Sequence, residues 1–385
     1  MKPEGAGPVV RVSNAIKTYG PTVALSGVTL DAYAGEILGI VGHNGAGKST
    51  LMRLLSGLEL PDNASVTIGG VSTPGRTGYP GVRMAYQEGS LALELTVKEN
   101  IHLSSARWLP AWRWHAAAAE RAVQRLTEIF PDHAIGPHDH VDDLPLADRQ
   151  RVEIARATLC DDLRVLILDE PTESLSGRSV DHLYAYLHGL RAAGVAIILV
   201  SHRLREVLAA CDRVAVMKDG AVVSIQPGGS VTEQDLLTAM GGETASTEAG
   251  RSAGLPRHAA SRPVAVRVPM ATVHGAPCEI TAAKGEVIGL AGIAGQGQET
   301  VLARLWQARH GDVEVSASRA YVPGDRQRSG ILPLWDVARN LTITAVASLA
   351  ERGLRRVEAE NALVGQWVQR LQVRGGAQAQ VTSLS

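Results

Sequence analysis

The chain has few aromatic residues, few cysteines and almost no net charge. Its 385 residues include one phenylalanine and three cysteines, and the formal net charge is −1. The cysteines lack metal-like spacing and indicate no disulfide framework, which fits a reducing compartment, and the near-neutral charge does not favour a nucleic-acid-binding surface. No apolar run approaches the roughly 20 residues that span a bilayer, and the N-terminus has no apolar signal segment. The length and 45% hydrophobic content predict a globular protein of two domains.

The sequence does contain a glycine-rich loop between a predicted strand and a predicted helix. The apolar run Ile37–Val41 precedes Gly42–Thr50, whose sequence is GHNGAGKST. In this pattern backbone N–H groups surround phosphates, and the helix N-terminus favours negative charge. We predict nucleoside triphosphate binding, with Lys48 at the β- and γ-phosphates and Ser49 as a ligand of Mg²⁺. The other residues expected at the nucleotide are Gly42, Asn44, Gly45, Gly47 and Thr50.

Two adjacent acids follow a second apolar run. Val165–Leu168 predicts a buried strand, and Asp169 and Glu170 come directly after it. Neighbouring strand residues face opposite ways, so the two carboxylates are expected to serve different roles. Asp169 is predicted to hold Mg²⁺, and Glu170 to polarise the water that attacks the γ-phosphate.

These motifs resemble those of ABC-type ATPases over nearly the whole chain. Asp169–Thr172 resembles the Walker B motif, and Ser201–Arg203 resembles the switch region, whose histidine, here His202, contacts the γ-phosphate in the family. Gln87 matches the Q-loop glutamine, which the resemblance makes a sensor of Mg²⁺ and water and a link to a membrane partner. Tyr19 occupies the place of an adenine-stacking aromatic, and a core tyrosine is the alternative. The implied fold is an α/β P-loop NTPase with a helical subdomain.

An internal repeat predicts a tandem duplication. Ala34–Gly42 returns as Lys284–Gly292, and a Gly/Ser/Thr/Ala-rich stretch between the halves predicts a flexible linker. We therefore expect one complete nucleotide-binding domain at 1–240, a linker at 241–262 and a partial second domain at 263–385. Residues 91–144 are expected to form the helical subdomain of the first; the three tryptophans in this stretch face a transporter or belong to the core.

The second half has lost chemistry at its own glycine-rich loop. Gln298 and Glu299 replace the lysine and the serine of the first loop, so weak or altered nucleotide binding is expected. Residues 321–330 resemble a motif in the second half of ATPase subunits from ribose- and galactose-type sugar importers. The usual glutamate before Asp325 is Gly324 here.

The signature motif of the first half is degraded as well. Leu144–Gln150 keeps the leucine, but Pro145 offers neither a hydroxyl nor an N–H group to a phosphate, and Asp148 adds negative charge. Because such domains pair head to tail in the family, both defects fall on one composite site, which predicts an asymmetric ATPase. The counterparts of the signature and of Walker B in the second half are expected beyond Ser385. The sequence thus predicts a C-terminally truncated second domain, a need for a second half or a second copy, and weak turnover by this chain alone.

The resemblance implies an ATPase subunit that energises an importer for monosaccharides or related small polar solutes. Its expected cofactors are ATP and Mg²⁺, and its expected partners are an integral-membrane permease dimer and, indirectly, an extracytoplasmic solute-binding protein. It would lie in the cytoplasm, peripheral to the inner face of the membrane, without nucleic acid. The alternative is a regulatory or vestigial module without productive turnover. A translation or DNA-repair protein would need a basic surface, a long coiled coil or a zinc hook, and the sequence has none.

Overall fold

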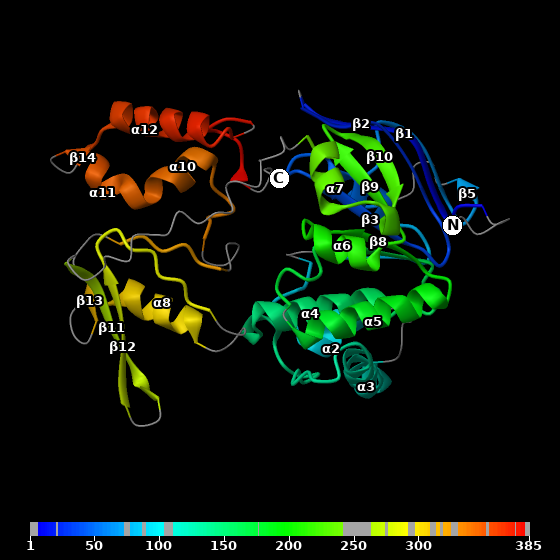
Figure 1. Ribbon diagram of the computed structural model, residues 1–385, viewed down its shortest axis with the longest axis horizontal. Helices are drawn as coiled ribbons and strands as arrows, with labels where there is room; N and C mark the ends of the chain where they lie inside the picture. The colour runs from blue at the N-terminus through cyan, green and yellow to red at the C-terminus, as the bar shows by residue number, and fades with distance from the viewer. Residues whose placement is uncertain are drawn as a thin grey trace. The chain divides into compact units, whose positions relative to one another are not determined.

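The computed structural model describes the chain with several gaps (Figure 1). The described residues are 7–20, 22–72, 78–86, 90–103, 111–175, 177–241, 263–273, 276–291, 297–308, 313–315, 319–324, 330–351, 354–373 and 375–381. They divide into two compact units, one up to residue 241 and one from residue 263 onward. Apart from Gly241, the predicted linker lies outside the described residues, so its bounds stay a prediction.

The centre of the first unit is a six-stranded sheet with the order β10-β9-β3-β8-β7-β6. Its strands are β3 (Ile37–Gly42), β6 (Val82–Ala85), β7 (Val165–Asp169), β8 (Ala196–Val200), β9 (Arg213–Lys218) and β10 (Ala221–Pro227). All neighbours are parallel except β10, which is antiparallel to β9. Every residue of β3 and β8 is buried, which confirms the fully buried strands that their apolar runs predict.

A four-stranded antiparallel sheet covers one face of this central sheet. Its order is β2-β1-β4-β5, from β1 (Val10–Tyr19), β2 (Thr22–Ala32), β4 (Asn63–Ile68) and β5 (Val71–Ser72). Helix α1 (Lys48–Ser56) buries Leu51, Met52, Leu54 and Leu55 in the same core as Leu38 and Ile40 of β3. The other side chains of β3, Ile37 and Val41, point into a second core. The period-two alternation of a strand therefore separates two cores within one unit.

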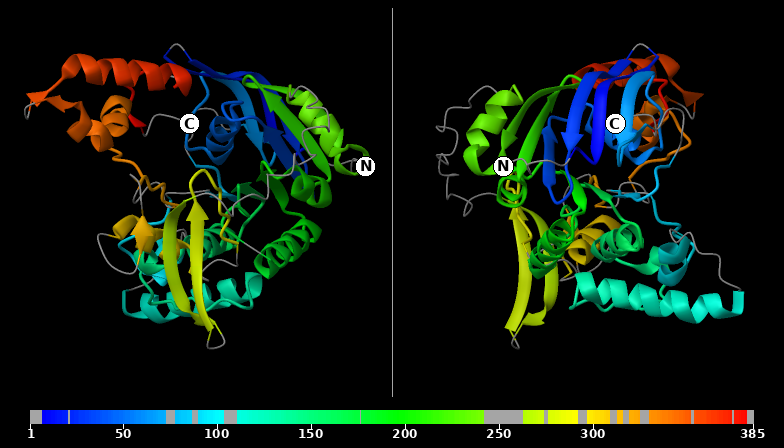
Figure 2. Two further views of the ribbon diagram at one scale, coloured as in Figure 1. Left: turned by 60° about the vertical axis from the view of Figure 1, so that its left-hand side comes forward. Right: turned by 90° about the vertical axis from the view of Figure 1, so that its right-hand side faces the viewer.

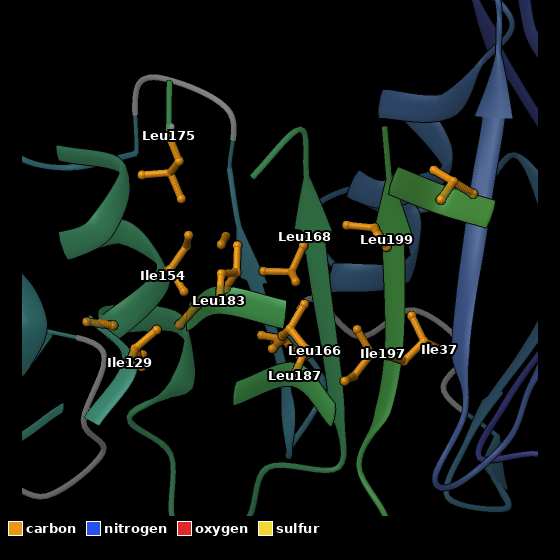
Figure 3. Close-up of a cluster of buried hydrophobic side chains, with 14 of the residues drawn as sticks. Ile37, Ile129, Ile154, Leu166, Leu168, Leu175, Leu183, Leu187, Ile197 and Leu199 are labelled. Carbon is orange, nitrogen blue, oxygen red and sulfur yellow. The ribbon is translucent and has the colours of Figure 1, made fainter. Parts of the chain in front are cut away.

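Helices form the second core on the opposite face of the central sheet. They are α4 (Leu146–Thr158), α5 (Arg178–Ala192), α6 (Leu204–Ala210) and α7 (Glu233–Ala239). Figure 3 shows Ile154 of α4 and Leu183 and Leu187 of α5 around the leucines of β7 and β8. In both views of Figure 2 the blue antiparallel strands and the green helices lie on opposite sides of the central sheet.

A helical region lies between β6 and β7 in the sequence, as residues 91–144 predict. It contains α2 (Val97–Leu103), α3 (Ala111–Ile129) and a 3₁₀ turn at Val141–Asp143. The only phenylalanine of the chain, Phe130, is fully buried at the end of α3, and the guanidinium carbon of Arg151 lies 5.6 Å from its ring centroid. Trp108 and the side chains of Trp112 and Trp114 lie outside the described residues. No helix in the described ranges is long and apolar enough to cross a membrane.

The second unit contains a three-stranded antiparallel sheet and several helices. The strands are β11 (Val264–Val273), β12 (Ala276–Ala283) and β13 (Glu314–Val315), with a small pair, β14 (Ala350–Glu351) and β15 (Leu354–Arg355). The helices are α8 (Gln298–Gln307), α10 (Val337–Thr342), α11 (Val346–Leu349) and α12 (Val357–Arg370). Thr342 of α10 donates a hydrogen bond of 2.9 Å to the buried Glu360 of α12, which ties these two helices together.

The two halves of the chain make matching hydrogen bonds in their helical regions. Asn100 of α2 accepts from the N–H of Ala92 at 2.8 Å and donates to its carbonyl at 2.9 Å. Asn340 of α10 makes the same two bonds to Leu332, at 2.8 and 3.0 Å. The bridge between Thr96 and His140 likewise returns as one between Asp336 and Gln380. The two helical regions therefore share one local design, which the sequence comparison above missed.

The repeat of β3 does not form a strand. Residues 286–291 have no regular structure, and Val287 is 92% exposed. In the first unit β3 pairs with β8 and β9. Among the described residues, no strand pairs with residues 286–291. An apolar run becomes a buried strand only where other strands pair with it.

Candidate functional site

The glycine-rich loop connects the carboxyl end of β3 to the N-terminus of α1, as its spacing predicts. Gly45 and Gly47 have φ angles of 81° and 95°, and Gly47 is the N-cap of α1. A Cβ atom on Gly47 would lie 2.4 Å from the carbonyl oxygen of Ala24 in β2. The N–H of Gly220 donates to the carbonyl of Ala46 at 3.1 Å, which holds the loop from the other side. The sequence reasoning missed these supports from Ala24 and Gly220.

Lys48 is held inside this loop. Its Nζ atom donates to the carbonyls of Gly42 at 2.7 Å and His43 at 3.0 Å. Burial lowers the pKa of Lys48, and the nearby carboxylates Glu170 and Asp169 oppose that shift. The first turn of α1 has no acidic residue, and Ser49 is exposed. A cation, free helix N–H groups and an exposed hydroxyl at one helix start fit a phosphate with its Mg²⁺.

Asp169 ends β7 as predicted, but the prediction for Glu170 was wrong in one respect. Glu170 is not the next residue of the strand: its φ is 50°, in the left-handed region, and its N–H donates to the carbonyl of Val200 at 2.9 Å. This turn, rather than strand alternation, separates the two carboxylates. Burial and the charge of Glu170 raise the pKa of Asp169 to about 6, with Lys48 opposing them.

Glu170 and His202 lie in direct contact. His202 Nδ1 is 2.8 Å from Oε2 of Glu170, and the N–H of His202 donates to the same oxygen at 3.3 Å. The Glu170 side chain is 11% exposed and that of His202 is 59% exposed. With its proton on Nδ1 the ring donates to the carboxylate and leaves Nε2 for another partner. The structure thus brings together two residues that the sequence predicts for one reaction. Among the described residues, no group of three or more His, Cys, Asp or Glu side chains gathers as a metal site.

Tyr19 lies at the end of β1 and is 43% exposed, so it is not a core residue. Its hydroxyl donates a hydrogen bond to Glu59. Partial burial and the bond to Glu59 raise the pKa of this hydroxyl. Of the two interpretations of Tyr19, only the adenine-stacking one remains, and it stays a prediction.

Gln87 lies outside the described residues, but the chain on both sides of it is bound to α4. The N–H of Tyr86 donates to Glu153 at 3.0 Å, and Arg156 donates to the carbonyl of Ser90 at 2.9 Å. Glu153 is 3% exposed and pairs with Arg156 at 2.8 Å. This buried pair therefore fixes the described residues on both sides of Gln87, and no sequence motif pointed to it.

The degraded signature begins α4 without a hydroxyl cap. Pro145 is the N-cap, and its carbonyl accepts from the N–H groups of Asp148 and Arg149 at 3.0 Å. Arg149 turns back to donate to the carbonyl of Leu144 at 2.9 Å, while Asp148 pairs with Arg151 at 3.2 Å. The charged side chains at the start of α4 therefore find their partners within this segment. The loss of phosphate contacts here stays a prediction.

The second glycine-rich loop keeps the backbone of the first at its last glycine. Gly297 precedes α8 with φ 95° and ψ 7°, against φ 95° and ψ 5° for Gly47. A Cβ atom on Gly297 would meet nothing within 4 Å, unlike one on Gly47. Residues 292–296 and 325–329 lie outside the described residues. The second loop therefore still leads into a helix, although Gln298 and Glu299 stand where the first loop has Lys48 and Ser49.

A strand–loop–helix phosphate site on a mostly parallel sheet defines a P-loop nucleotide-binding protein. A profile of the ABC transporter family matches residues 25–173, which contain the loop, the degraded signature and the acidic pair. Together with relatives that are 30 to 33% identical over nearly all of the chain, this match shows that the chain belongs to the ATP-binding proteins of ABC transporters. The match ends before His202.

Curated relatives are similar over nearly all of this chain. Ribose import ATP-binding protein RbsA 2 of Streptomyces avermitilis is 33% identical over 96% of this chain and 76% of the relative. Ribose import ATP-binding protein RbsA of Rhodococcus jostii is 30% identical, with coverage of 95% and 76%. A putative ribose/galactose/methyl galactoside import ATP-binding protein of Agrobacterium fabrum is 32% identical, with coverage of 89% and 72%.

Solved structures support the fold. The ATP-binding subunit of an ABC transporter superposes with a TM-score of 0.51 at 24% identity, over 63% of this chain and 97% of that one. A dimeric ATP-binding cassette in a post-hydrolysis state with ADP and phosphate gives a TM-score of 0.52 at 24% identity, over 58% of this chain and all of the cassette. The P-loop α/β fold expected from the sequence is confirmed.

Proposed function

We propose that this chain is the ATP-binding and ATP-hydrolysing subunit of an ABC importer for monosaccharides or related small polar solutes. The observation that carries the proposal is the contact between His202 and Glu170 at the same sheet edge as Lys48 and Asp169. Lys48 supplies a cation for the phosphates and Asp169 a carboxylate for the metal. Glu170 supplies the base, and His202 is the hydrogen-bond partner of that base. The curated relatives, which carry import in their names, support the solute class.

The roles follow from the geometry of each side chain. Lys48 exchanges its two carbonyl acceptors for phosphate oxygens, which are stronger acceptors because they are charged. Ser49 and Asp169 hold Mg²⁺, with Gln87 as a further ligand, and the metal, when bound, neutralises phosphate charge. Glu170 orients the attacking water and takes its proton, and His202 fixes the carboxylate from the side. Tyr19 stacks on adenine, and the backbone of Gly42–Thr50 surrounds the phosphates.

The partners we propose are a permease dimer in the membrane and, indirectly, an extracytoplasmic solute-binding protein. The chain would then work at the cytoplasmic face of the membrane and never touch the solute, so the partners would select the sugar. ATP binding would close two nucleotide-binding domains and hydrolysis would reopen them. The second domain or a second copy would supply the signature that Lys48 needs.

Substitution of Glu170 by Gln tests the proposal. Cells that lack the chain are complemented with wild type or Glu170→Gln, and uptake of labelled ribose, galactose and xylose is measured. We expect uptake of at least one sugar with wild type and none with Glu170→Gln, although the purified variant still binds ATP. Full uptake with Glu170→Gln would instead favour the regulatory or vestigial module, because such a module needs no base.

A further inference from the structure

Glu206 of α6 accepts hydrogen bonds from the loop after β7, from α5 and from the residue that caps its own helix. Its Oε2 atom accepts from the hydroxyls of Thr172 at 2.7 Å and Tyr184 at 3.2 Å, and its Oε1 atom accepts from Arg203 at 3.0 Å. The side chain is 22% exposed. Burial raises the pKa of Glu206, but the bonds from Thr172 and Arg203 outweigh burial and leave the pKa lowered. A carboxylate with this many donors is fixed in one position.

The donors belong to the two loops that carry the catalytic pair. Thr172, which is 1% exposed, lies two residues after Glu170. Arg203 directly follows His202, and its N–H donates to Ser201 at 3.0 Å. Glu206 therefore connects the loop after β7 to the loop after β8, close to the contact between Glu170 and His202.

The strand pairing of the sheet provides only part of this connection. The pairing of β7 with β8 ends at Asp169 and Val200, and Glu170 leaves the strand with a φ of 50°. A residue other than glycine in this region costs of order 1 kcal/mol and persists only where its surroundings hold it. The N–H of Glu170 still donates to the carbonyl of Val200 at 2.9 Å. Beyond that bond, the relative position of the Glu170 and His202 side chains also depends on contacts between the two loops.

We propose that Glu206 is a positioning residue for ATP hydrolysis, which holds Glu170 and His202 at their 2.8 Å contact by linking Thr172 to Arg203. The inference rests on the proposed function, since it assigns Glu206 to the same reaction. It acts through the pair and touches no nucleotide itself. Nothing in the sequence singles it out, because three donors reach it from positions up to 34 residues away.

The test uses the whole chain and two readouts. The first is single-turnover hydrolysis of ATP with protein in excess, together with ATP affinity. The second is the ring resonance of His202 in the ligand-free protein, assigned among the 12 histidines by its loss in His202→Gln. We compare Glu206→Ala and Glu206→Gln with Thr172→Val, which removes one donor at nearly constant shape. The control is Arg205→Ala, because Arg205 on the same helix pairs with Glu233 at 3.1 Å, away from the site.

Glu206→Ala and Thr172→Val should shift the His202 resonance, and Glu206→Ala should lower the hydrolysis rate about 100-fold, as a misplacement near 1 Å does, without a matching loss of ATP affinity. Glu206→Gln should keep the His202 resonance and the hydrolysis rate near those of the wild type. Its amide oxygen accepts from Arg203 while its NH₂ group donates to the hydroxyl of Thr172. Arg205→Ala should change neither.

An unchanged His202 resonance and hydrolysis rate in Glu206→Ala would overturn the inference. The proposed function fails separately, if Glu170→Gln hydrolyses ATP as fast as wild type in the same assay. In that case the His202 resonance still decides whether Glu206 positions the pair.

Discussion

His202 Nδ1 lies 2.8 Å from Oε2 of Glu170, although 32 positions separate the two residues in the chain. The contact forms because β7 and β8 are parallel neighbours, so that the loops at their carboxyl ends leave the same edge of the sheet. A carboxylate that is 11% exposed thereby gains a hydrogen-bond donor from a ring that is mostly exposed.

Substitution of His202 by Gln is expected to lower the rate of ATP hydrolysis by roughly 100-fold, because the base loses its lateral donor. ATP affinity should change much less, since phosphate binding depends on the loop. Single-turnover kinetics and an ATP titration measure the two quantities. His188→Gln on the exposed side of α5 is the matched control, and a His202→Gln rate equal to that of His188→Gln would refute the role.

Replacing Lys48 by Met should weaken ATP binding about 10- to 100-fold, the range expected for a lost charge-assisted hydrogen bond. The two carbonyls that Lys48 now contacts belong to Gly42 and His43 and lose their donor as well. Isothermal titration with ATP and Mg²⁺ measures the change. Lys284→Met, at an exposed position in the second unit, should leave the affinity as it is. Equal affinities for the two variants would argue against phosphate binding by Lys48.

Two glycine substitutions distinguish the cost of a left-handed backbone from the cost of a steric clash. Gly194→Ala tests the first alone, and Gly47→Ala in the phosphate loop tests both. Gly194 has a φ of 91° and a Cβ atom there would meet nothing within 4 Å, so Gly194→Ala should cost about 1 kcal/mol. Gly47 has a φ of 95°, but its Cβ would lie 2.4 Å from the Ala24 carbonyl. We expect Gly47→Ala to cost about 3 kcal/mol or more in the free energy of unfolding, and to abolish ATP binding. If Gly47→Ala and Gly194→Ala unfolded at the same urea concentration, the steric clash between residue 47 and the Ala24 carbonyl would be contradicted.

Asp169 should oppose the stability of the ligand-free protein at neutral pH. Burial and Glu170 raise its folded pKa to about 6, above the ordinary aspartate pKa of 3.8. The folded state therefore holds the proton over that interval and the unfolded state does not. Stability then falls as pH rises from about 4 through 6, and the full penalty is present above the folded pKa. Asp169→Asn removes the charge and should stabilise the protein at pH 7.5 by roughly 1 to 3 kcal/mol.

The gain from Asp169→Asn should shrink as the pH is lowered below 6, because the wild-type carboxyl is then protonated in the folded state. Urea unfolding at pH 7.5 and pH 5 measures the difference, with Asp219→Asn at an exposed turn as the control. A stability gain that is the same at both pH values would show that ionisation of Asp169 is not its source.

Local pattern was sufficient for much of the fold and the site. The runs before Gly42, Asp169 and Ser201 are apolar throughout, and each forms a buried strand of the central sheet. The loop that begins at Gly42 takes the conformation that its glycines require. The same reasoning was too simple at Glu170, whose left-handed turn no residue type announces. It also left Tyr19 open, because exposure depends on what packs over a ring.

The sequence by itself determined the P-loop α/β fold and the glycine-rich loop between a strand and a helix, because both rest on residue types at fixed spacing along the chain. The switch role of His202 and the duplication stay predictions of the same kind. Only the tertiary structure decided the contact between Glu170 and His202 and the link through Glu206, since those depend on which strands become neighbours. It also decided that the same apolar pattern is a buried strand at Ile37–Gly42 and no strand at 286–291. A strand is completed by hydrogen bonds from its neighbours, and β3 has β8 and β9 beside it while its repeat has neither.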